Sequence, residues 1–171
     1  MHQPWNSNAY GISLGGGTQK DITITENLFY NLMKRSLLVK AQTDWSNIKV
    51  TKNRFADPGL DACLIEHSGD FTKVSYADNS YSGQPDQDWF CGDVTGDITT
   101  WTAASGETGA TKFTPAFTDP NRTAGTYAET LGLDPTLEAF LRAARLQTRL
   151  NWNPAYTAKK INNYIRTGFE Q

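Results

Sequence analysis

The sequence has few of the residues from which a metal centre or a disulfide framework is built. Of its 171 residues, two are cysteine and two are histidine. Cys63 and Cys91 have no metal-ligand spacing around them, and we expect two buried thiols rather than one bridge. His2 and His67 are too few for a histidine-rich metal site. The sequence therefore predicts no resident cofactor or metal.

Long apolar runs and a strong charge of one sign are also missing. No run approaches the roughly 18 apolar residues of a membrane span. The formal net charge is -2, which gives no reason to expect a nucleic acid. We therefore expect neither a membrane nor a nucleic-acid partner. The first residues lack a secretory signal, so the chain is cytoplasmic, or it is a mature or truncated form of an extracellular or periplasmic protein.

What the sequence does contain is a repeat of 26 residues in stretches that alternate apolar and polar side chains, as half-buried strands do. The equivalent positions are Ile22, Ile48 and Val74, then Ile24, Val50 and Tyr76, then Asn27, Asn53 and Asn79, then Phe29, Phe55 and Tyr81. A second series places Ile12, Leu38, Leu64 and Phe90 in one register pointing inward. A fixed period in strand-like sequence is typical of a solenoid. The asparagines suit a left-handed corner and can bond to one another along the stack.

Residues 22–31 and 48–55 resemble coils of the pectate-lyase-like, single-stranded right-handed parallel β-helix family. In that family each coil has three strands, with an asparagine between the second and the third. The resemblance covers about residues 8–100, and it places first strands at residues 37–40, 63–66 and 89–92. It implies an all-β fold, a short right-handed parallel β-helix of about four coils, with a C-terminal α-helical tail.

The repeat weakens after Gly92. We interpret residues 97–102 as one more strand and residues 103–118 as irregular loop. Asp134 and Pro135 predict the N-cap and first residue of a helix, and a second short helix is expected from Thr157. The predicted organisation is coils and loop over residues 1–118, then a linker and helical tail over residues 119–171. That tail is expected to pack on the β-helix, either as a cap on its last coil or along its side.

The first coil has no comparable cap, because residues 1–8 are too short for a helix. An uncovered strand end invites pairing with another chain. We therefore expect either the C-terminal part of a longer protein or an oligomer that buries this N-terminal coil.

Enzymes of the family that the sequence resembles usually bind a polysaccharide along the first strand and its loops. That likeness makes Glu66, Asp70 and Asp93 candidate catalytic carboxylates on coils ~4.8 Å apart. Two of them would serve a glycoside hydrolase as general acid and base. In a polysaccharide lyase they would instead hold Ca²⁺, with a base-side group from Lys40 or Arg35. His67 is a candidate general base.

The remaining candidates are substrate-binding groups near the same strands. They are Arg35 and Asp61, with Asp86 and Asp88 nearby, and the tryptophans Trp45 and Trp89, with Trp5 and Trp101 as further sugar-stacking candidates. Charged residues at strand ends are, however, mostly solvated, and no nucleophile motif is present. The alternative is therefore a non-catalytic C-terminal module of a larger β-helix protein, serving as stabiliser, binding surface or oligomerisation unit. The sequence alone leaves open whether the protein is an enzyme.

Overall fold

The computed structural model of the protein describes residues 10–32, 34–56 and 62–169. The chain divides into two compact units, unit 1 from Met1 to Pro115 and unit 2 from Ala116 to Gln171. This boundary lies close to the one expected at residue 118. Each unit is described by itself.

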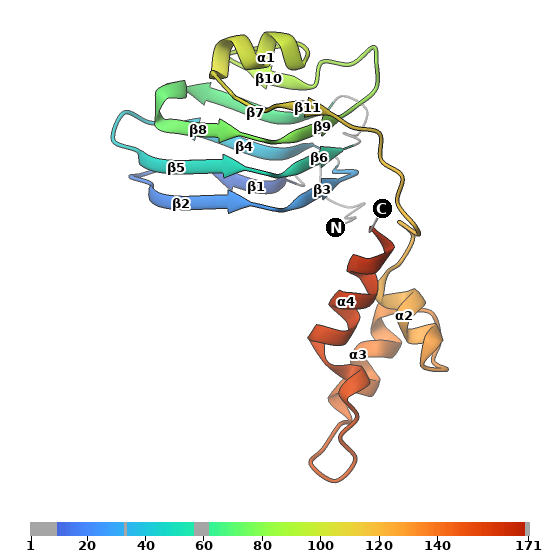
Figure 1. Ribbon diagram of the computed structural model, residues 1–171. Helices are drawn as coiled ribbons and strands as arrows, with labels where there is room; N and C mark the ends of the chain where they lie inside the picture. The colour runs from blue at the N-terminus through green and yellow to red at the C-terminus, as the bar shows by residue number, and fades with distance from the viewer. Residues whose placement is uncertain (1–9, 33, 57–61, 170–171) are drawn as a thin grey trace. The chain divides into compact units, whose positions relative to one another are not determined.

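Unit 1 holds eleven strands within the described residues, and they form three parallel sheets (Figure 1). The first sheet contains β1 (Tyr10–Leu14), β4 (Arg35–Ala41), β7 (Cys63–Gly69) and β10 (Phe90–Gly92). The second contains β2 (Lys20–Thr25), β5 (Ser46–Thr51) and β8 (Val74–Ala77). The third contains β3 (Leu28–Tyr30), β6 (Arg54–Ala56), β9 (Ser80–Ser82) and β11 (Thr111–Lys112). The chain therefore visits the sheets in turn.

The described residues also form four α-helices and two short 3-10 helices. Unit 1 has η1 (Phe71–Lys73) and α1 (Ile98–Ser105), and unit 2 has α2 (Ala124–Thr130), α3 (Leu137–Arg145), η2 (Pro154–Tyr156) and α4 (Ala158–Gly168). The expected fold class, an all-β short parallel β-helix, is therefore wrong. The described chain has a mixed α/β fold, because helices form inside the sheet-bearing unit and make up most of the regular structure after it.

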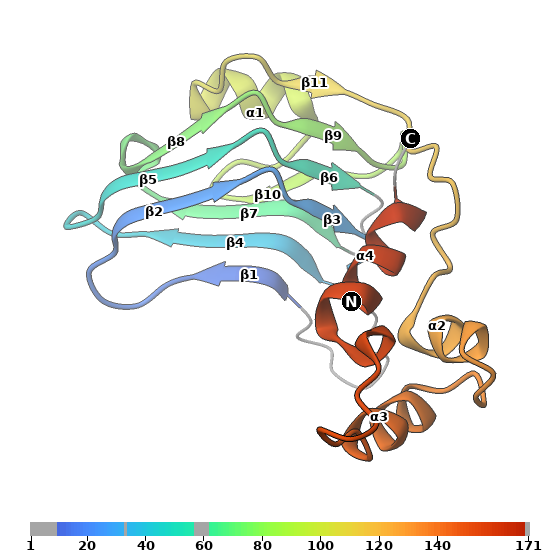
Figure 2. The same cartoon turned by 60° about the horizontal axis from the view of Figure 1, so that its bottom comes forward.

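Helix α1 replaces the strand expected at residues 97–102, and its end residues explain why. The side chain of Asp97 accepts hydrogen bonds from the backbone N–H groups of Thr99 and Thr100, and Gly106 ends the helix in the left-handed conformation at φ 66°. These N-cap and C-cap features outweigh the strand preference of isoleucine and threonine. Figures 1 and 2 both place α1 at the end of unit 1 opposite β1, β2 and β3. This helix, which belongs to unit 1 itself, covers that end.

The second and third sheets pair in the 26-residue register. Ile22 lies beside Ile48, which lies beside Val74, and Phe29, Phe55 and Tyr81 form the corresponding row of the third sheet. The rings of Phe29 and Phe55 stack with centroids 4.8 Å apart, and those of Phe55 and Tyr81 stack at 5.5 Å. Like side chains therefore lie over one another and fill the interior of unit 1.

The first sheet pairs differently from the expected series Ile12, Leu38, Leu64 and Phe90. Ile12 lies beside Leu37, Leu37 beside Ile65, and Ile65 beside Phe90. A shift of one residue turns every side chain of a strand to the opposite face. Leu37 and Ile65 therefore enter the core, which puts His67 on the inner face with Ile65 and leaves Glu66 on the other face.

The corner between the second and third sheets also differs from the expected one. The left-handed residues are Glu26, Lys52 and Asp78, with φ between 54° and 56°, and not the asparagines that follow them. The side-chain amides of Asn27 and Asn53 instead donate to the carbonyls of Thr25 and Thr51. Each of these asparagines thus supports the corner by bridging the left-handed residue before it.

Unit 2 packs its three α-helices around Ala128, Phe140 and Ile161. The N-cap of α3 is Thr136, whose hydroxyl accepts from the N–H of Ala139, and not Asp134 as expected. Thr157 directly precedes α4, close to the expected start. Helix α2 lies within the segment interpreted as linker, and Thr123 caps it with a hydroxyl that accepts from the N–H of Thr126.

Candidate functional site

His67, the predicted general base, lies on β7 with its side chain in the core of unit 1. Its exposed fraction is 0%, and its ring stacks on that of Phe71 with centroids 3.9 Å apart. Nδ1 lies 2.8 Å from the hydroxyl of Tyr76, while Nε2 has no hydrogen-bond partner among the described residues. Trp101 of α1 meets the ring edge-on at 6.4 Å. Aromatic rings thus surround the imidazole.

Burial determines the charge of this histidine. Desolvation lowers the pKa of His67 from 6.5 to about 4, and the negative charges of Asp93 and Asp70 oppose that shift only in part. The imidazole is therefore neutral at pH 7. A general base must reach the proton that it removes, and a side chain with no exposed surface does not reach a polysaccharide.

Glu66, one of the predicted catalytic carboxylates, is held by Arg35. The Nε–H of Arg35 donates to Oε2 of Glu66 at 2.8 Å, and both side chains are about one-quarter exposed or less, at 18% and 25%. A second guanidinium nitrogen of Arg35 donates to the carbonyl of Lys34. Lys40, the predicted base-side group, is not the neighbour of Glu66, because Lys40 lies beside Ser68 and Leu38 lies beside Glu66.

Asp70 and Asp93 meet near the end of β7, and both are exposed. Asp93 accepts a hydrogen bond from the backbone N–H of Gly69 at 2.7 Å. Asp70 accepts from both the N–H and the hydroxyl of Thr72, and these bonds lower the pKa of its carboxyl. Asp70 thus stabilises the turn that begins η1, and Asp93 links the chain after β10 to the end of β7. The structure brings Asp70 and Asp93 together but places Glu66 in a separate ion pair.

A glycine directly precedes each of these two aspartates in the sequence. Gly69 and Gly92 have φ of 99° and 103°, and a Cβ added to them would lie 2.1 Å and 2.2 Å from the carbonyl oxygens of Ala41 and His67. Only glycine fits a position that is both left-handed and this crowded. The two glycines therefore set where Asp70 and Asp93 leave the sheet.

The predicted sugar-stacking tryptophans are core residues. Trp45 is 2% exposed, Trp89 is 9% exposed and Trp101 is fully buried. The indole N–H of Trp45 donates to the carbonyl of Gly17, and that of Trp89 donates to the carbonyl of Gln84. None of these three offers a ring face to a sugar. Trp5 and Asp61 lie outside the described residues.

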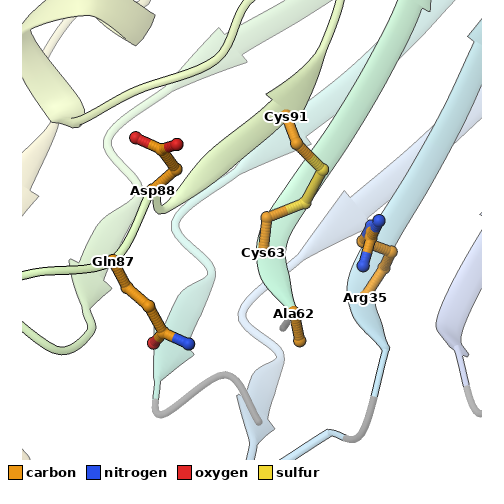
Figure 3. A pocket seen from close by; sticks show the side chains of 6 residues that line it. All are labelled: Arg35, Ala62, Cys63, Gln87, Asp88 and Cys91. Atoms are coloured by element: carbon orange, nitrogen blue, oxygen red, sulfur yellow. A yellow bond between two sulfur atoms is a disulfide. The ribbon is translucent and has the colours of Figure 1, made fainter. Parts of the chain in front are cut away.

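Cys63 and Cys91 form a disulfide between β7 and β10, so the expectation of two thiols is wrong. Figure 3 shows the bridge with Arg35 on one side and Gln87 and Asp88 on the other. These residues and Ala62 line an open hollow of about 210 Å³. A second hollow of about 280 Å³ lies in unit 2, beside Ala139 and Arg142, and contains no predicted site residue.

The most extensive polar cluster in the core centres on Glu107, which the sequence did not indicate. Asn27 donates to Asn53, and Asn53 donates to Asn79, in each case through both backbone and side-chain nitrogens. Asn79 donates in the same way to Oε1 of Glu107. The hydroxyl of Tyr81 and the indole N–H of Trp101 donate to Oε2 at 2.7 Å and 2.6 Å. Glu107 therefore ends the row of asparagines and fastens α1 to it.

Among the described residues no group of three or more His, Cys, Asp or Glu side chains is placed to hold a metal ion. No helix in this described part is both long and apolar enough to cross a bilayer.

The chain matches no protein-family model, and the comparisons with curated proteins and with solved structures found no match either.

Proposed function

We propose that unit 1 is a non-catalytic scaffold, a stiff body that stabilises and presents other parts of the protein. The observation that carries this proposal is the engagement of the predicted catalytic groups on and beside β7. His67 is buried and neutral, and Glu66 is tied to Arg35. Asp70 holds a local turn, and Asp93 is hydrogen-bonded to the backbone of Gly69 on β7. These interactions occupy polar atoms that a catalytic site would use to bind a substrate.

The acid–base chemistry of the site supports the same proposal. A glycosidase needs one carboxyl group whose pKa is raised, so that it stays protonated and donates to the leaving group. The pKa of Asp70 is lowered instead, and Glu66 lies beside a permanent positive charge. The lowered pKa of Asp70 favours its ionised form, which does not serve as that acid.

The interior of unit 1 supports a mechanical role. Stacked rings, the asparagine row that ends on Glu107, and the Cys63–Cys91 bridge all join one strand to the next. Disulfides persist in oxidising compartments. We therefore place the protein, as part of this proposal, outside the cytoplasm, the second of the two localisations that the sequence leaves open.

A second candidate function is cleavage of a polysaccharide, and one observation favours it. Asp70 and Asp93 are both exposed, and Asp93 accepts the N–H of Gly69, the residue directly before Asp70. Paired carboxylates suit a hydrolase or, with Ca²⁺, a lyase.

One experiment separates the two functions. The purified full chain is incubated with neutral and acidic polysaccharides, with and without Ca²⁺, and both reducing ends and unsaturated products are measured. The scaffold proposal expects no product with any of them. Product formation that is lost in Asp93→Asn, with unfolding unchanged, would establish the enzyme.

A further inference from the structure

Unit 2 exposes large apolar side chains on α3 and in the segment that joins α3 to η2. Leu150 is 98% exposed, Leu146 67% and Trp152 62%. On α3 itself, Leu137 and Leu141 are 55% and 38% exposed, one helical turn apart. These are the exposed large hydrophobic residues of the described chain, and all five fall within 16 consecutive positions.

In the segment from residue 146 to residue 153, several polar side chains hydrogen-bond within the segment or to the residues that follow it. Asn151 accepts from both the N–H and the hydroxyl of Thr148. Gln147 accepts from the N–H of Asn153, and Asn153 accepts from the N–H of Ala155. The polar groups thus hold the segment in shape while leucine and tryptophan face outward. Ordinary surface loops have the reverse arrangement, and an exposed apolar patch of this kind marks an interaction site.

Basic side chains accompany these apolar ones. Residues 139–169 contain six basic residues and no acidic residue. Arg142, Arg145 and Arg149 are exposed, and no ion pair to any of them is found among the described residues. We call Arg145, Leu146, Arg149, Leu150 and Trp152 the tip surface.

We propose that the tip surface attaches unit 2 to the face of a lipid bilayer that contains anionic lipid. Leucine side chains would enter the outer part of the acyl region, and Trp152 would lie at the level of the headgroups, where an amphipathic ring is favoured. The arginines would contact lipid phosphates, which their planar guanidinium groups bind well. Attachment of this kind lies in the interface, consistent with the absence of a membrane-crossing helix from the described residues.

Charge distinguishes this partner from a second copy of the chain. A two-fold symmetric contact would bring the same patch of both copies together, and Arg145 and Arg149 of each copy would then face their own counterparts. An anionic lipid surface is complementary to both the apolar and the basic members of the patch. The segment also projects from the helices of unit 2 in Figure 1, which suits a flat surface better than a concave one.

This inference goes beyond the scaffold proposal and does not depend on it, because it concerns unit 2 alone. It differs from the sequence-based expectation of no membrane partner, which considered only membrane spans. A positive polysaccharide assay would end the scaffold proposal and leave the lipid proposal intact.

The test is co-sedimentation of the full chain with vesicles of phosphatidylcholine alone and of phosphatidylcholine with phosphatidylserine. Binding is expected to the second and not the first, and to weaken as salt is added. Leu150→Ser combined with Trp152→Ser should abolish it, while Trp152→Phe should retain it. Arg145→Gln combined with Arg149→Gln should weaken binding by roughly tenfold or more.

The matched control is Lys20→Gln combined with Lys49→Gln, which removes two exposed charges from unit 1 and should leave binding unchanged. Far-ultraviolet circular dichroism verifies that each variant is folded. The proposal is overturned if the folded wild type does not sediment with anionic vesicles. It is equally overturned if the Leu150 and Trp152 variant binds as the wild type does, or if sedimentation velocity shows that the patch instead forms a dimer in the absence of vesicle binding.

Discussion

Oε1 of Glu107 accepts the side-chain amide N–H of Asn79 at 2.7 Å, in the position that the next asparagine of the row would take. Oε1 accepts the backbone N–H of Asn79 as well, as Asn79 does for Asn53. The second oxygen, Oε2, has no counterpart in the row and accepts from Tyr81 and Trp101. One carboxylate thus ends the hydrogen-bonded row and joins α1 to the sheets.

Glu107→Gln should lower the free energy of unfolding by about 2 kcal/mol, because the new amide NH₂ faces a hydrogen-bond donor on one side or the other. Urea unfolding of unit 1 measures this, with Glu129→Gln as the control for loss of an exposed carboxylate. Equal stability of the two variants would show that Glu107 does not hold the end of the row.

His67 should make stability depend on pH between about 6.5 and 4. Its pKa is about 4 in the folded protein and 6.5 when unfolded, so on acidification the unfolded chain binds the proton first. Stability from this group is therefore fully present above pH 6.5 and falls as the pH drops toward 4, by on the order of 3 kcal/mol. Asp70 and Asp97, whose pKa values hydrogen bonds lower from 3.8, lose their contribution only in more acidic solution.

The comparison for this prediction is His67→Phe, which keeps a ring in the stack and removes the titration. The difference in unfolding free energy between wild type and variant, measured from pH 7 to pH 4, isolates His67, because His2 is common to both. A pH-independent difference would contradict a buried, neutral imidazole.

The Cys63–Cys91 disulfide should stabilise unit 1 by about 3 kcal/mol, since it closes a sequence separation of 28 residues. Urea unfolding with and without a reductant measures this in the wild type. Cys63→Ala combined with Cys91→Ala should show the lower stability in both conditions. Two free thiols in the native protein, detected by mass spectrometry after alkylation, would contradict the bridge.

The ion pair of Arg35 with Glu66 should contribute little, because both side chains retain contact with water. Arg35→Gln should cost roughly 1 kcal/mol or less in unfolding free energy. Its control is Lys40→Gln, an exposed strand residue for which the structure shows no ion pair within the described range. A loss of several kcal/mol in Arg35→Gln alone would mean that the pair is a buried structural element.

The register of the second and third sheets follows from the sequence because their connections are equal in length. Ile22, Ile48 and Val74 recur every 26 residues, and so do Phe29, Phe55 and Tyr81. The register of the first sheet does not follow from the 26-residue period. Its neighbouring residues Ile12, Leu37, Ile65 and Phe90 are separated by 25, 28 and 25 residues. These spacings average to 26, so a fixed period matches both ends of the series and misplaces the two middle strands.

That one-residue error also misplaces part of the candidate site. If Leu64 pointed inward, alternation would place Ile65 and His67 on the outer face of β7 and Glu66 on the inner face. Alternation from the true register instead puts His67 among Phe71, Tyr76 and Trp101. The strand sequence itself does not reveal this register, because the register depends on the length of the connection between neighbouring strands.

The role of Glu107 could not be predicted from the sequence for a related reason. It follows Asn79 by 28 residues and is a different residue type, so neither the period nor the asparagine pattern points to it. The sequence signal that was available is Asp97 before a short helix that ends at Gly106. An N-cap at Asp97 implies a helix in place of the expected strand, and that helix carries Trp101 to the carboxylate of Glu107.

The most direct test of the scaffold account is product formation from polysaccharides by the purified, folded chain. The account predicts no new reducing ends and no unsaturated products from neutral or acidic polysaccharides, with or without Ca²⁺, for the wild type and for Asp70→Asn and Asp93→Asn alike. Turnover by the wild type that either substitution abolishes, while the unfolding free energy stays the same, would contradict it and make these two carboxylates catalytic residues.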